Sequence, residues 1–135
     1  MIAPQDEGSE RRQRGEGVIY VVDDEPMLLD LASAILEPSG YTVETFRSPE
    51  TALRAFEQAE PRPALIITDY AMHSMTGLEL AGACRRIQPR QKVLLVSGTV
   101  ALDLIQNEPV QPDGFLTKPY QAKQLVEAVR ATLAE

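Results

Sequence analysis

Five polar residues stand where four short apolar runs of the sequence end: Asp23, Asp24, Asp69, Ser97 and Lys118. Three carboxylates in one small volume cannot all ionise cheaply, because each raises the pKa of its neighbours. A hard divalent cation relieves this repulsion, and Mg²⁺ prefers oxygen ligands. A lysine opposite the ion would help to neutralise the oxygens of a phosphoryl group. We therefore expect a phosphoryl group as the ligand, since one carboxylate can attack its phosphorus. These residue types predict formation of an aspartyl phosphate.

The apolar runs alternate with helical stretches, which predicts an α/β fold. The expected strands cover residues 18–22, 41–46, 64–68, 93–96 and 114–117. The expected helices cover residues 26–36, 49–60, 76–88 and about 101–107, with a last one marked by Leu125, Val126, Val129 and Leu133. Strands that alternate with helices form parallel sheets with right-handed crossovers, so we expect a doubly wound five-stranded parallel sheet.

This topology explains why the polar residues matter together. In an open parallel sheet, ligands bind at the carboxyl ends of the strands. The residues at the ends of the four runs therefore converge at one edge. The fourth helix should be short or irregular, because Pro109 and Pro112 prevent its extension toward the fifth strand.

Length and composition predict one soluble domain. The chain has 135 residues, and residues 1–17 are almost without apolar side chains, so we expect a disordered tail over 1–17 and a domain over 18–135. No run of residues is long and apolar enough for a membrane span, and the opening residues do not resemble a secretory signal, which favours a cytoplasmic protein. The formal net charge of −7 argues against direct binding to nucleic acid.

Taken singly, each polar residue also has a structural interpretation. Asp24 is suited to capping the helix that follows it, and Asp69 to forming a turn. Ser97 would be an ordinary loop start and Lys118 an ordinary solvated turn residue. Their joint placement after successive strands favours the chemical interpretation.

Four segments together resemble the receiver domain of two-component response regulators (CheY-like). The segments are Val21–Pro26, Leu65–Gly77, Ser97–Gly98 and Gly114–Pro119. The resemblance covers about residues 17–135 and implies the flavodoxin-like strand order 2-1-3-4-5. It also implies a phosphorelay module that accepts a phosphoryl group from a sensor histidine kinase or a histidine phosphotransfer protein. Such a module carries out phosphotransfer and dephosphorylation on itself and is not otherwise an enzyme.

The resemblance assigns a role to each residue of the acidic site. Asp69 corresponds to the phosphoacceptor. Asp24, Asp69 and the backbone carbonyl of Ala71 correspond to direct Mg²⁺ ligands, whereas Asp23 acts mainly through water. Lys118 corresponds to the lysine that contacts the phosphoryl oxygens.

Further residues match the family's signalling elements. Ser97 matches the hydroxyl that binds a phosphoryl oxygen, and Gly98 matches the small residue that keeps the acceptor accessible. Phe115 matches the aromatic switch, and Pro119 matches a cis-proline. One departure concerns His73, which stands where the family usually has proline and is expected to be an exposed loop residue.

Other functions remain open from sequence alone. A flavodoxin-like electron carrier needs a loop that cradles the FMN phosphate, and the acidic residues 23–25 would repel it. An aspartyl-phosphate phosphohydrolase usually carries an acid where Ala71 stands. A receiver that has lost its chemistry is disfavoured because the site residues are all present. The kinase, the signal, the output partner, the oligomeric state and the phosphate lifetime are not determined, nor whether the domain acts alone or within a hybrid kinase.

Overall fold

The computed structural model describes residues 17–98 and 101–135, so the tail expected over 1–17 lies outside the described residues except for Gly17. The five strands are β1 (Val18–Val22), β2 (Thr42–Phe46), β3 (Leu65–Asp69), β4 (Val93–Ser97) and β5 (Gly114–Thr117). All neighbouring pairs are parallel, in the order β2-β1-β3-β4-β5. This confirms the predicted doubly wound sheet.

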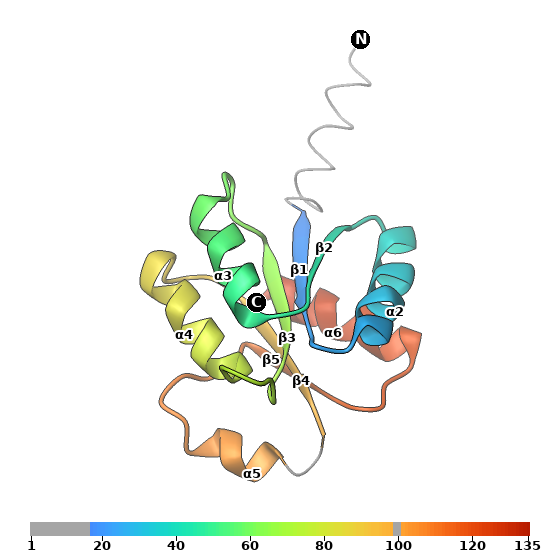
Figure 1. Ribbon diagram of the computed structural model, residues 1–135. Coiled ribbons are helices and arrows are strands. Elements are labelled where there is room, and N and C mark those ends of the chain that lie inside the picture. Colours follow the sequence, from blue (N-terminus) through green and yellow to red (C-terminus); the bar gives the residue numbers. More distant parts are fainter. Residues whose placement is uncertain (1–16, 99–100) are drawn as a thin grey trace.

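The helices cover both faces of the sheet (Figure 1). They are α2 (Pro26–Leu36, followed by the 3₁₀ turn η1, Glu37–Ser39), α3 (Pro49–Gln58), α4 (Gly77–Ile87), α5 (Ala101–Gln106) and α6 (Ala122–Ala134). In Figure 1, α2 and α6 lie on one face, and α3 and α4 lie on the other. The six-residue α5 confirms the expected short fourth helix.

Strand β1 shows how the sheet forms two cores. Successive side chains of a strand point to opposite faces. Ile19 and Val21 therefore pack in the cluster that includes residues of α2 and α6, whereas Tyr20 and Val22 pack in the cluster that includes residues of α3 and α4. A strand buried on both faces reads as a continuous apolar run, which is the pattern of residues 18–22.

Side chains cap the starts of α3 and α4, whereas the cap suggested for α2 is absent. The Ser48 hydroxyl accepts the Thr51 N–H at 3.2 Å and caps α3. Thr76 and Glu79 form a capping box at the start of α4, with hydrogen bonds of 2.9 and 3.1 Å. The capping interpretation of Asp24 is wrong, because Glu25 occupies the N-cap of α2. The Asp24 carboxylate is therefore not committed to this helix end.

Cys84 on α4 is 1% exposed, and burial raises the pKa of its thiol to about 12. Within the described residues, no helix is both long enough and apolar enough to cross a bilayer.

An alanine at position 77 should destabilise the domain. Gly77 begins α4, and an added Cβ would collide with the carbonyl oxygen of Asp69 and lie 2.9 Å from Leu95. Forcing an atom into such a site costs about 1–3 kcal/mol. Urea unfolding should show this loss for Gly77→Ala. Gly98→Ala is the control, because no described atom lies within 4 Å of its added Cβ; an equal loss in both variants would contradict the steric explanation.

Candidate functional site

The three aspartates predicted to act together do meet at the carboxyl edge of the sheet. Val22 of β1 pairs with Thr68 of β3, so the two strands end side by side. Asp23 and Asp24 follow β1, and Asp69 is the last residue of β3. One ligand oxygen from each of the three carboxylates lies within 4.8 Å of the others. The side chains of Asp23 and Asp69 are mostly shielded from solvent, with 8% and 12% exposed.

Lys118 approaches this cluster from the other side. It follows β5, and its backbone N–H donates to the Ser97 carbonyl of β4 at 2.8 Å. The Lys118 ammonium lies 3.3 Å from Asp23 Oδ2 and 3.4 Å from Asp69 Oδ1. The Lys118–Pro119 peptide bond is cis, as the family resemblance implied. One cation therefore contacts two of the three carboxylates.

The charges of the cluster act on one another. Burial raises the pKa of the Asp69 carboxyl; the Lys118 ammonium opposes this rise, whereas the Asp23 charge adds to it. Burial alone would lower the pKa of Lys118, but the charges of Asp23 and Asp69 outweigh it and raise that pKa. Lys118 therefore stays charged at neutral pH, while ionised Asp69 is held at a cost in free energy.

The other predicted residues lie on neighbouring elements. Ser97 ends β4, is buried, and pairs with Thr117 of β5. Ala71 lies on an exposed loop two residues after Asp69. Phe115 of β5 is half-buried and packs against the small buried cluster of Leu78, Leu95 and Ile105. Since Ile105 is on α5, Phe115 connects β5 to the short helix.

Two contacts near the site were not predicted from sequence. His73 is exposed, as expected, at 87% of its side chain, but its Nδ1 atom lies 3.4 Å from Asp24 Oδ2. Tyr70, directly after Asp69, donates its hydroxyl to Glu108 Oε2 at 3.3 Å. The only sequence signal for the first contact was the departure from the family pattern at residue 73.

The donor set suits a hard divalent cation. Carboxylate oxygens are the ligands that Mg²⁺ prefers, and it commonly keeps several waters. Asp24 does not cap α2, so its carboxylate is available to an ion. Asp23 and Asp69 already contact one positive charge, the Lys118 ammonium. The residues present therefore fit Mg²⁺, and a bound ion would relieve the repulsion among the three carboxylates.

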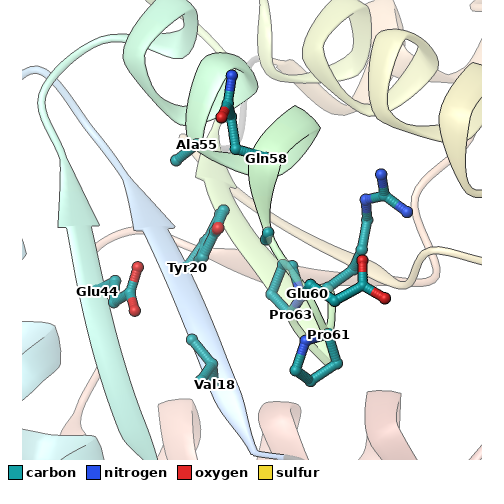
Figure 2. Close-up of a pocket in the computed structure, with 10 residues that line it drawn as sticks. Val18, Tyr20, Glu44, Ala55, Gln58, Glu60, Pro61 and Pro63 are labelled. Carbon is teal, nitrogen blue, oxygen red and sulfur yellow. The ribbon is translucent and has the colours of Figure 1, made fainter.

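A separate pocket lies near the amino ends of the strands (Figure 2). It has a volume of about 400 Å³ and is lined by Val18, Tyr20 and Glu44 of the sheet together with α3 and the residues before β3. Burial and the Glu44 charge raise the pKa of the Tyr20 hydroxyl. None of the predicted site residues lines this pocket.

Curated proteins with similar sequences include transcriptional regulatory proteins and DNA-binding response regulators. The chain is 31% identical over 125 residues to the probable transcriptional regulatory protein TcrX of Mycobacterium tuberculosis. The matched region covers 91% of this chain and 53% of TcrX. The chain is also 30% identical over 115 residues to the DNA-binding response regulator MtrA of Mycolicibacterium smegmatis, covering 85% and 50%. The chain thus spans about half the length of these relatives.

Solved structures agree with the sequence relatives. A CheY-like receiver domain protein from Methanospirillum hungatei matches with a TM-score of 0.79 and 27% identity, over 87% of this chain and 94% of that one. Chemotaxis protein CheY4 of Vibrio cholerae matches with a TM-score of 0.77 and 26% identity, over 86% and 98%. The family profile of the response regulator receiver domain matches residues 19–130. The chain therefore belongs to the response regulator receiver domain family.

Proposed function

We propose that Asp69 accepts a phosphoryl group from a histidine kinase or a histidine phosphotransfer protein in a Mg²⁺-dependent reaction. The observation that carries the proposal is the Lys118 ammonium, which lies within 3.4 Å of both Asp23 and Asp69. The ion would be held by Asp24, Asp69 and the Ala71 carbonyl, with Asp23 beside it.

The residues divide the chemistry among them. An Asp69 carboxylate oxygen attacks phosphorus, and the bond from phosphorus to the donor's imidazole nitrogen breaks. The Lys118 ammonium can pair with the Asp69 carboxylate before the transfer and with phosphoryl oxygens after it. The Ser97 hydroxyl can donate a hydrogen bond to another phosphoryl oxygen. Bound Mg²⁺ would supply further neutralisation of the phosphoryl oxygens. No separate substrate is turned over, so the domain acts as a signalling module rather than as an enzyme.

The output of the domain is also proposed rather than established. We expect phosphorylation to reorder Phe115 and α5 and so to change the surface offered to a downstream protein. TcrX and MtrA are named as transcriptional or DNA-binding regulators, but this chain matches only about half of each. With its net charge of −7, the domain itself is not expected to bind nucleic acid directly.

Beryllofluoride, an analogue of the phosphoryl group, tests the proposal on the intact chain. Adding it with Mg²⁺ to ¹⁵N-labelled protein should shift the amide signals of Asp69, Ser97 and Lys118. Asp30→Asn, which changes an exposed aspartate of α2, should respond like the wild type, whereas Asp69→Asn should not respond. A wild-type spectrum unchanged by the addition contradicts the proposal. Sustained turnover of a generic phosphate ester would instead favour a phosphohydrolase.

The segment from Asp103 to Pro112 should exchange its amide hydrogens faster than the strands. Within this segment only Ile105 is buried and Val110 is half-buried against the clusters beside α4, whereas Leu104 is 57% exposed, so few apolar side chains hold it. Weakly packed segments open most readily. Hydrogen exchange measured by mass spectrometry should show fast exchange here that slows when beryllofluoride and Mg²⁺ bind. Strong protection in the unmodified protein would contradict this expectation; the neighbouring residues 99 and 100 lie outside the described residues.

A further inference from the structure

We propose that His73 is an additional ligand of the divalent ion at the acidic cluster, and that it shifts the site's selectivity toward ions that accept imidazole nitrogen, such as Co²⁺. The inference rests on the metal site of the proposed function. His73 would thus determine which ion this receiver prefers.

The distance between His73 and Asp24 fits two donors of one ion. Their Nδ1 and Oδ2 atoms lie 3.4 Å apart. Neighbouring ligand atoms of an octahedral ion with bonds near 2.1 Å lie about 3 Å apart. A small movement of the imidazole therefore brings its nitrogen to an ion held by Asp24. The ring is free to make it, because 87% of the side chain is exposed.

The backbone on either side of His73 is anchored, although its ring is exposed. Met72 packs against the buried cluster between the sheet and helices α3 and α4. The Ser74 hydroxyl donates to the Glu50 carboxylate at the start of α3. The loop thus presents His73 beside Asp24, and only the two side-chain torsions must be ordered for coordination.

The nitrogen donor changes the chemistry of the ion site. Carboxylate, carbonyl and water oxygens suit Mg²⁺, whereas imidazole suits later transition metals. Adding one imidazole to a site made of carboxylates therefore raises its affinity for Co²⁺ more than its affinity for Mg²⁺. A neutral ring coordinating through Nδ1 carries its proton on Nε2.

The chain contains a single histidine, which makes the test unambiguous. We would add Co²⁺ to the tag-free protein labelled with ¹⁵N-histidine and record the ring signals by NMR. Coordination should move the carbon-bound ring protons, Hδ2 and Hε1, far outside the diamagnetic range; unlike the N–H proton, they do not exchange with solvent. Calorimetric titrations with Co²⁺ and Mg²⁺ should show that His73→Gln lowers the ratio of Co²⁺ to Mg²⁺ affinity at least about tenfold. His73→Pro, which installs the residue usual in the family, should lower it similarly.

Two results would overturn the inference while leaving the proposed function intact. One is a wild-type protein that binds both ions but shows no strongly shifted carbon-bound ring proton of His73. The other is an equal fall in both affinities in His73→Gln, because a histidine that only orients Asp24 would affect the two ions alike. If the wild type binds neither ion, the inference fails together with the Mg²⁺-dependence of the proposed function.

Discussion

Replacing Asp69 with asparagine is expected to raise the free energy of unfolding at neutral pH in metal-free buffer. Asp69 is 12% exposed, and burial together with the nearby Asp23 charge holds its pKa above the ordinary value despite the opposing Lys118 ammonium. The folded protein therefore carries an ionised carboxylate that would be better solvated in the unfolded chain. A neutral amide of similar shape removes that cost.

The pH dependence of this gain has a defined sign. Because the pKa of Asp69 is raised by folding, the folded state binds more protons than the unfolded state above the ordinary value of 3.8. The contribution of Asp69 to stability is thus fully present below pH 3.8 and is lost as the pH rises through its folded-state pKa. The extra unfolding free energy of Asp69→Asn over wild type should therefore be absent below pH 3.8 and should reach its full value above the folded-state pKa of Asp69.

Urea unfolding of both proteins across this pH range, in the presence of a chelator, measures the difference. Asp30→Asn is the matched control, since Asp30 is exposed on α2 and its replacement should change stability by less than about 0.5 kcal/mol. With saturating Mg²⁺ the order should reverse, because an ion at a hundred times its Kd adds about 2.7 kcal/mol to the protein that binds it. A metal-free Asp69→Asn protein less stable than wild type at neutral pH contradicts the account.

Replacing Lys118 with methionine should have the opposite effect. Its ammonium contacts the Asp23 and Asp69 carboxylates, and methionine leaves both without their shared cation. Leaving buried charged groups unpaired costs about 1–3 kcal/mol, with the lower half expected here because Lys118 is 26% exposed. Since folding raises the pKa of Lys118, the stability it contributes is fully present below pH 10.5 and is lost as the pH rises through its folded-state value.

The Lys118 prediction is tested by a double-mutant cycle in metal-free buffer. Lys118→Met should lower the free energy of unfolding at neutral pH, whereas Lys123→Met, at an exposed position of α6, should not. The loss should be smaller in the Asp69→Asn background, because only Asp23 then loses a partner. If Lys118→Met costs the same in both backgrounds, Lys118 and Asp69 are not energetically coupled.

Local signals explain why much of the fold was predictable. The Ser48 cap and the Thr76–Glu79 capping box involve groups three positions apart, so sequence spacing alone specifies them. Pro109 similarly limits α5 through its missing N–H group. The convergence of the three aspartates was also predictable, because the topology of a parallel sheet brings the carboxyl ends of its strands to one edge.

Contacts between loops could not be predicted, because they join residues that are far apart in the sequence. The Tyr70–Glu108 hydrogen bond joins residues 38 positions apart, and its geometry depends on how α5 packs. The approach of His73 to Asp24 depends on how its loop is held, including the hydrogen bond from Ser74 to Glu50 of α3. The N-cap position was ambiguous because Asp24 and Glu25 are adjacent acids, and only the path of the chain out of β1 determined which one begins α2.

Intact-mass measurement after incubation with acetyl phosphate tests the central claim most directly. With Mg²⁺ present, the wild-type chain should gain the mass of one phosphoryl group, and peptide mapping should place it on Asp69. The gain should disappear in Asp69→Asn and when the metal is chelated, but persist in Asp30→Asn. A phosphoryl group that still appears on Asp69→Asn, or that forms equally without metal, would contradict Asp69 as the Mg²⁺-dependent phosphoacceptor.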